Sequence, residues 1–197
     1  MFLTTQLAHG AWLYWDTNNT TSGLGTTAGT WATGTTTTMR TVAPADGRTM
    51  IDGTLATTTA ITTTTSDTLS FGTLNLALSG GATTVTVSGT QSIGNITFGL
   101  AQTNAMTLTG GTINFAAAGT IYSLAPSTTQ TISSVISGAG TSLTTGGQGT
   151  IQLTNANTYT GTTIVTSGGT LIIGNGATGS LNGTTGTAPR SSLAVAP

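Results

Sequence analysis

Apolar and polar residues alternate in short runs along most of this chain. Thr84-Val85-Thr86-Val87 is one such run, and Met106-Thr107-Leu108-Thr109 and Thr163-Ile164-Val165-Thr166 repeat the pattern. Alternation with a period of two places one kind of side chain on each face of a strand. Gly, Asn or Ser, which are typical turn residues, separate the runs. The pattern therefore predicts many short strands that each bury one face.

A second, longer pattern is superimposed on this alternation. The motif Gly-Thr-(Leu/Ile)-x-(apolar) recurs, with copies that begin at Gly72, Gly111, Gly149 and Gly169 and a weaker copy at Gly53. The starts are separated by 19 (53 to 72), 39 (72 to 111), 38 (111 to 149) and 20 (149 to 169) residues. The long gaps contain two candidate missing copies, at Gly94–Phe98 and Thr131–Val135. The implied period is therefore about 19–20 residues.

A period of this length indicates a solenoid, in which each repeat forms one coil stacked on the next. Helix-forming residues are scarce, and each repeat holds two or three short alternating runs. We therefore predict an all-β fold, a parallel β-helix with coils of about 19–20 residues. The alternative is a β-sandwich of hairpins, for which Asn175-Gly176 and Asn182-Gly183 are suitable turns. A sandwich, however, provides no reason for such a period.

The two ends of the chain differ from its centre. Residues 1–49 hold all three tryptophans, and an open solenoid end needs a cap over its unpaired strand edges. We predict an aromatic N-terminal cap or assembly segment over 1–49, the solenoid over 50–176, and a C-terminal tail or assembly segment over 177–197. Five aromatic residues of the first segment are candidate contacts for assembly or for a ligand: Phe2, Trp12, Tyr14, Trp15 and Trp31.

The amino-acid composition argues against several classes of partner and of structure. Threonine makes up roughly a quarter of the chain, charged residues only 4%, and the formal net charge is −1. This balance disfavours electrostatic capture of nucleic acid. The 36% of hydrophobic residues distinguishes the chain from a disordered one. No apolar run approaches the roughly 20 residues that a membrane-spanning helix requires.

Groups capable of acid–base or metal chemistry are few. His9 is the single histidine, there is no cysteine, and the acids are Asp16, Asp46, Asp52 and Asp67. A zinc site needs several Cys or His ligands, and glycoside hydrolysis needs two acids flanking a cleft. Arg48 lies between Asp46 and Asp52, which indicates a local ion pair in a loop. We therefore predict no catalytic residue, no metal ion and no cofactor.

Residues 143–171 read LTTGGQGTIQLTNANTYTGTTIVTSGGTL. The elements Gly-x-Gly-Thr-Ile-x-Leu from Gly147, Asn-Thr-Tyr-Thr-Gly from Asn157, and Gly-Thr-Leu from Gly169 resemble the autotransporter-associated β-strand repeat of bacterial passenger domains. Thr145 replaces the lysine common in that family, and only one clear repeat is present. The resemblance implies a right-handed parallel β-helix that is secreted or exposed on the bacterial surface, in which the repeat is scaffold.

Together these observations predict a non-enzymatic extracellular structural subunit, a homo-oligomer or homopolymer that assembles head-to-tail into a fibre or surface layer. One alternative is an adhesin-like passenger fragment that binds a host or carbohydrate surface. A minor alternative is an ice-binding solenoid, because Thr84-Val85-Thr86 and Thr107-Leu108-Thr109 have the Thr-x-Thr spelling of flat threonine ladders. In the sequence that spelling is not repeated at one fixed phase in every coil.

Overall fold

The computed structural model describes a large part of the chain. The described residues are 10–17, 24–26, 28–33, 39–41, 62–74, 77–78, 83–116, 118–166, 168–181, 185–187 and 192–196. Within these ranges the chain forms strands and turns and no helix. Several residues singled out in the sequence lie outside the described residues: Phe2, His9, Asp46, Arg48, Asp52 and the weak motif copy at Gly53.

The described strands form three sheets. The eight-stranded sheet contains β1 (Trp12–Trp15), β3 (Met39–Thr41), β4 (Thr68–Phe71), β7 (Asn95–Phe98), β10 (Ala118–Ser123), β13 (Ser142–Gly147), β15 (Thr163–Val165) and β17 (Thr185–Thr187). The seven-stranded sheet contains β2 (Gly29–Trp31), β5 (Thr83–Val87), β8 (Met106–Thr109), β11 (Thr129–Ile132), β14 (Thr150–Leu153), β16 (Thr170–Ile173) and β18 (Ser192–Val195). The three-stranded sheet contains β6 (Thr90–Ser92), β9 (Thr112–Asn114) and β12 (Val135–Ser137).

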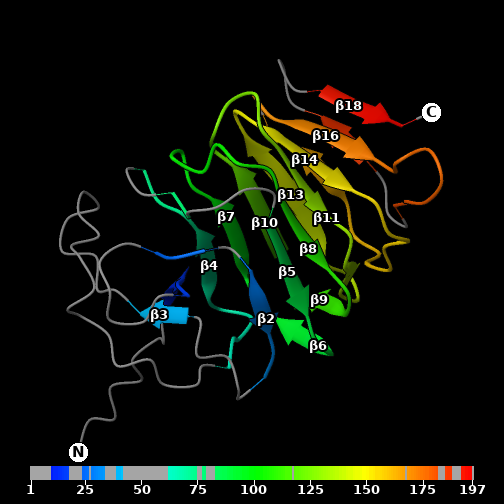
Figure 1. The fold of residues 1–197 in the computed structure, drawn as a ribbon. Helices are drawn as coiled ribbons and strands as arrows, with labels where there is room; N and C mark the ends of the chain where they lie inside the picture. The colour runs from blue at the N-terminus through cyan, green and yellow to red at the C-terminus, as the bar shows by residue number, and fades with distance from the viewer. Residues whose placement is uncertain are drawn as a thin grey trace, which may run out of the picture.

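The chain visits these sheets in rotation. From β4 to β12 it passes from the eight-stranded to the seven-stranded to the three-stranded sheet three times. Every strand pair among the described residues is parallel except β1 with β3. Figure 1 shows the strands stacked side by side from the blue end of the chain to the red end. This arrangement confirms the predicted all-β parallel β-helix.

Coil length varies along the solenoid. Thr150 pairs with Thr170, as the repeat from Gly149 to Gly169 predicts. Nearer the N-terminus the step is longer, since Thr68 pairs with Asn95 of the next coil. The motif copies also fall on different faces: Thr112 begins β9 of the three-stranded sheet, whereas Thr150 begins β14 of the seven-stranded sheet. The copy at Gly72 instead follows the end of β4, so the motif does not mark one fixed point of a coil. The coil length predicted from its period is too short for most of the described coils.

Inward side chains align in columns from coil to coil. One buried column on the eight-stranded sheet contains Leu13, Leu69, Ile96 and Ile121. Another on the seven-stranded sheet contains Val85, Leu108, Ile132, Leu153 and Ile173. Each of these aliphatic residues packs on an aliphatic residue of the next coil. The inward residues of successive strands therefore form one continuous apolar core.

Aromatic rings fill the core at its N-terminal end. The rings of Trp15 and Phe71 are 5.6 Å apart between centroids, and those of Phe71 and Phe98 are 5.3 Å apart and stacked. Trp31 is also fully buried, and its Nε1 donates a hydrogen bond to the Thr63 hydroxyl at 3.2 Å. Trp15 and Trp31 are therefore core residues. This corrects the expectation that they contact a ligand or a neighbouring subunit.

The sheets cross both boundaries expected from the sequence. In the 1–49 segment, β1 and β2 pair in parallel with β4 and β5. In the 177–197 segment, β17 and β18 pair in parallel with β15 and β16. Both segments therefore contribute strands to the stack. The alternation of apolar and polar residues is weak in both segments, because a terminal coil has a neighbouring coil on one side only.

Buried amides hold the corners between sheets. The Oε1 atom of Gln102 accepts the Leu78 N–H at 2.9 Å, and that of Gln130 accepts the Met106 N–H at 2.8 Å. Both Nε2 groups donate to the Asn104 carbonyl, at 3.4 Å and 3.3 Å. The two glutamines are fully buried. They satisfy main-chain groups where the sheet ladder is interrupted by a turn.

Candidate functional site

The C-terminal end of the solenoid exposes the cross-section of its core. Strand β18 pairs with β16 along one edge, and no strand of the described part pairs with its other edge. Leu193 and Val195 continue the buried columns of Leu171 and Ile173, yet they are 38% and 74% exposed. A strand edge of this kind presents unpaired N–H and C=O groups beside apolar side chains. The sequence pattern marks this segment only as a tail or assembly segment and singles out neither residue.

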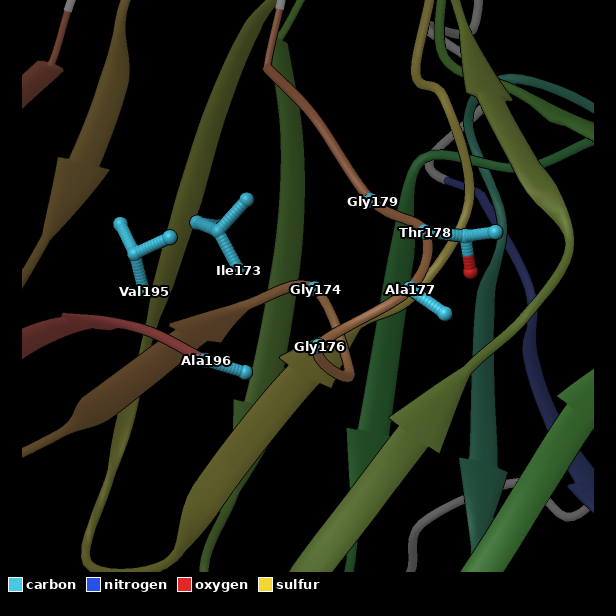
Figure 2. Close-up of a pocket in the computed structure, with 8 residues that line it drawn as sticks. All are labelled: Ile173, Gly174, Gly176, Ala177, Thr178, Gly179, Val195 and Ala196. Carbon is cyan, nitrogen blue, oxygen red and sulfur yellow. The ribbon is translucent and has the colours of Figure 1, made fainter.

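A shallow hollow of about 260 Å³ lies beside this edge. Its lining is uncharged: Ile173, Gly174, Gly176, Ala177, Thr178, Gly179, Val195 and Ala196. Figure 2 shows the Ile173 and Val195 side chains next to each other, and the turn from Gly176 to Gly179 lines the same hollow. The Asn175 side-chain oxygen accepts the N–H groups of Ala177 and Thr178, at 3.0 Å and 2.8 Å, which fixes the turn. The hollow thus presents a neutral, partly polar lining at the free end of the solenoid.

The opposite end of the stack is built differently. Strand β3 pairs antiparallel with β1 and is the last strand of the eight-stranded sheet. In the seven-stranded sheet the last described strand at this end is β2. The seven-stranded sheet therefore has two unlike terminal strands, β2 and β18, that run in the same direction.

Two of the predicted aromatic contacts meet at the surface of β1. Trp12 is 47% exposed, Tyr14 is half-buried, and their ring centroids are 6.3 Å apart with a tilt of 36°. Partial burial raises the pKa of the Tyr14 hydroxyl above its ordinary value. The structure therefore separates the five candidates: Trp12 and Tyr14 form a surface pair, Trp15 and Trp31 lie in the core, and Phe2 lies outside the described residues.

The most distinctive motif of the sequence, Asn157 to Gly161, forms an internal corner. The Asn157 side chain connects three coils: its oxygen accepts the Ile136 N–H at 2.9 Å, and its nitrogen donates to the carbonyls of Asn155 and Ser180, at 3.0 Å and 2.9 Å. A Cβ atom on Gly161 would collide with the Thr141 carbonyl oxygen, which already accepts the Gly161 N–H at 2.9 Å. The motif therefore works as scaffold within the solenoid.

Tyr159 occupies the centre of that corner. It is fully buried, and its hydroxyl shares a hydrogen bond of 2.6 Å with the Thr163 hydroxyl. Desolvation raises the pKa of Tyr159, while the bond with Thr163 lowers it by a smaller amount. Ionising this hydroxyl would place a charge inside the apolar core.

We expect the fold to lose stability in alkali through Tyr159. Because its pKa is raised in the folded state, the stabilisation is complete below the unfolded value of 10.0 and falls as the pH rises through the folded pKa. A Tyr159→Phe variant is expected to lose about 1 kcal/mol at neutral pH through the missing hydrogen bond. It is also expected to show a flatter decline above pH 10.0. Urea unfolding at several pH values measures both effects, and an unchanged alkaline slope would contradict this assignment.

The described carboxylates are buried and structural. Asp16 is fully buried. The Asp67 carboxylate accepts hydrogen bonds from the main-chain N–H groups of Ala11 and Thr64, both at 2.7 Å, and from the Thr64 hydroxyl at 2.8 Å. These bonds attach the turn before β4 to the residue before β1. No group of three or more His, Cys, Asp or Glu residues gathers within the described residues.

Over the described ranges, no helix is long and apolar enough to cross a bilayer. Comparison of the chain with protein-family models, curated proteins and solved structures finds no match.

Proposed function

We propose that this protein is a non-enzymatic structural subunit that stacks end to end into a fibre or layer. The observation that carries the proposal is the open end of the core, where Leu193 and Val195 continue buried columns but are exposed. A second copy of the chain is the partner that fits this end, because its own seven-stranded sheet ends in β2, a strand that runs in the same direction as β18.

The contact would extend the sheet by one strand. Strand β18 of one copy offers its free edge to β2 of the next, and parallel strand addition satisfies main-chain groups along that edge. Complete burial of an exposed apolar side chain contributes roughly 1.5–3 kcal/mol, so Val195, which is 74% exposed, would gain more from the contact than Leu193, which is 38% exposed. Since β2 and β18 are unlike, the contact is head-to-tail. Stacking along the solenoid axis moves each copy forward by one solenoid length, so the series stays open and generates a filament. A chain with 4% charged residues has little repulsion between copies.

The proposed location is outside the cell or on a bacterial surface. Its support is the resemblance of residues 143–171 to a passenger-domain repeat, together with a composition of only 4% charged residues and roughly a quarter threonine. Main-chain hydrogen bonds and packing columns, with no cysteine in the chain, suit a fold that persists there without disulfides.

An adhesin-like role is the second candidate. It is favoured by Trp12 and Tyr14, whose ring centroids lie 6.3 Å apart on the outer face of β1. Paired aromatic rings stack on the apolar faces of sugars and bring polar edges for hydrogen bonds. On a glycan array, we expect any bound glycan to be lost with Trp12→Ala. If the variant binds the same glycan as strongly as the wild type, the adhesin-like role of this aromatic pair is contradicted.

End-to-end stacking predicts a specific effect of lysine at the open end. We expect the wild type to show sedimentation coefficients that rise with protein concentration, and Leu193→Lys or Val195→Lys to sediment as a single small species, because each places a charge in the contact. The matched control is Ile164→Lys on the outer face of β15, since Ile164 is 39% exposed and Leu193 is 38% exposed. Association that is equally lost in the control, or unchanged in both end variants, would contradict stacking through β18.

A further inference from the structure

The outer face of the seven-stranded sheet carries threonine in three columns that are in register from coil to coil. The first column contains Thr84, Thr107 and Thr131. The second contains Thr30, Thr86 and Thr109. The third contains Thr129, Thr150 and Thr170, and Ser192 continues it. These columns form a two-dimensional array, which we call the threonine lattice.

Register explains why the sequence conceals this array. The step from Thr84 to Thr107 is one residue shorter than the step from Thr107 to Thr131, although the three residues form one column. Thr-x-Thr therefore does not recur at one fixed interval in the sequence. In the folded chain the turns contain the extra residue, so the threonine hydroxyls of successive strands still lie in line.

The lattice positions have the spacings of a β-sheet. Paired strands repeat at about 4.8 Å across the sheet, and alternate residues repeat at about 6.7 Å along a strand. The residues between lattice positions, such as Val85, Leu108 and Ile132, are buried, so the lattice side chains point outward. Threonine is branched at Cβ and has few χ1 rotamers, which restricts the hydroxyl and methyl positions.

The lattice hydroxyls are available to a ligand. Apart from the 2.8 Å bond between the hydroxyls of Thr170 and Ser192, none of the lattice hydroxyls has a side-chain hydrogen-bond partner among the described residues. The other described outward residues of these strands include Gln152, Ile172 and Ala194, and none is charged. The face is therefore neutral and covered with groups that both donate and accept hydrogen bonds.

The outer face of the eight-stranded sheet lacks this regularity. Its corresponding columns are interrupted by Asn95, Tyr122, Gly146 and Ile164, and among the described outward residues no more than two threonines, Thr120 and Thr144, follow one another. The first column of the lattice holds three threonines before Gln152 ends it. The lattice is therefore a property of one face, beyond what a threonine content of roughly a quarter would place on every face.

We propose that the threonine lattice binds ice. A soluble ligand would contact a few of these hydroxyls, whereas a rigid array repeating in two directions matches a ligand that itself repeats in two directions. Hydroxyl groups at fixed spacing hold a layer of water through hydrogen bonds, and the methyl groups beside them leave that layer free of strong ionic hydration. Such a layer can join a growing ice surface. This activity does not depend on end-to-end stacking, because the lattice lies along the side of the solenoid.

The test is thermal hysteresis, the gap between the melting and freezing temperatures of an ice crystal in a solution of the full chain. We expect the wild type to show a gap that grows with concentration. Thr107→Lys, at the centre of the lattice, is expected to lose most of it, because a charged side chain stands above the plane. Thr144→Lys, on the outer face of β13, is the matched control and is expected to keep the gap.

Circular dichroism verifies that each variant is folded, and Thr84→Lys provides a second lattice variant at an exposed position. Two results would overturn the proposal. One is the absence of any gap, and of any ice-crystal shaping, for the wild type over the range of soluble concentrations. The other is an equal gap in folded lattice and control variants.

Discussion

Replacing Asn157 with leucine is expected to lower the free energy of unfolding by about 3 kcal/mol or more, since each buried polar group left without a partner costs about 1–3 kcal/mol. The variant removes the acceptor for the Ile136 N–H and the donor for the Asn155 and Ser180 carbonyls at one time. Leucine has a similar volume but cannot form these bonds. The loss would fall on three successive coils, so the C-terminal half should open first.

Urea unfolding followed by far-UV circular dichroism measures the global loss, and hydrogen exchange places it along the chain. Gln152→Leu is the matched control, because Gln152 is half-buried and its Nε2 makes a single bond, to the Gly174 carbonyl at 2.8 Å. The control is expected to lose about 1 kcal/mol. Equal losses for the two variants would show that the Asn157 corner has no special role.

Phe98→Ala is expected to destabilise the N-terminal coils by roughly 3–5 kcal/mol, the usual range for a large aromatic removed from a core. Phe98 is fully buried and stacked on Phe71, whose ring in turn contacts Trp15. The next residue of the same column is Ser123, which is too small to fill the space left by the ring. The cavity would therefore persist.

The three tryptophans lie in the N-terminal segment, so their fluorescence reports on these coils. For Phe98→Ala we expect the fluorescence transition to move to lower urea, further than the circular dichroism transition of the whole solenoid. Leu100→Ala, at a side chain that is 42% exposed, is expected to stay within about 0.5 kcal/mol of the wild type. A similar shift for both variants would contradict the aromatic column as the source of stability.

Much of this fold is contained in simple sequence patterns. Alternation in runs such as Thr84 to Val87 predicts strands with one buried face, and the repeat from Gly149 to Gly169 gives one coil directly, since Thr150 pairs with Thr170. These predictions succeed because period-two alternation follows from strand geometry alone.

Other features depend on packing between coils. The motif copy at Gly111 has the same pattern as that at Gly149, yet the two begin strands of different sheets. Local sequence determines where a strand starts, whereas the number of residues in the preceding turns determines its sheet. Trp15 and Trp31 likewise look like surface contacts in the sequence, but the N-terminal coil encloses both.

The corner amides could not be assigned from one sequence. Gln130 and Asn157 stand among threonines and other small residues with nothing local to mark them as buried. Their role is to satisfy N–H groups that lie 24 and 21 residues earlier in the chain. Such partners become visible only when the coils are stacked. The open end at β18 could not be assigned from the sequence either, because only the stacked coils show that Leu193 and Val195 continue buried columns.

The most direct test of the proposed stacking is negative-stain electron microscopy of the purified full chain over a range of concentrations. We expect unbranched filaments one solenoid wide, whose length increases with concentration and which disappear in Val195→Lys but persist in Ile164→Lys. Uniform short rods at every concentration, or filaments that are unaffected by Val195→Lys, would contradict end-to-end assembly through the open C-terminal coil.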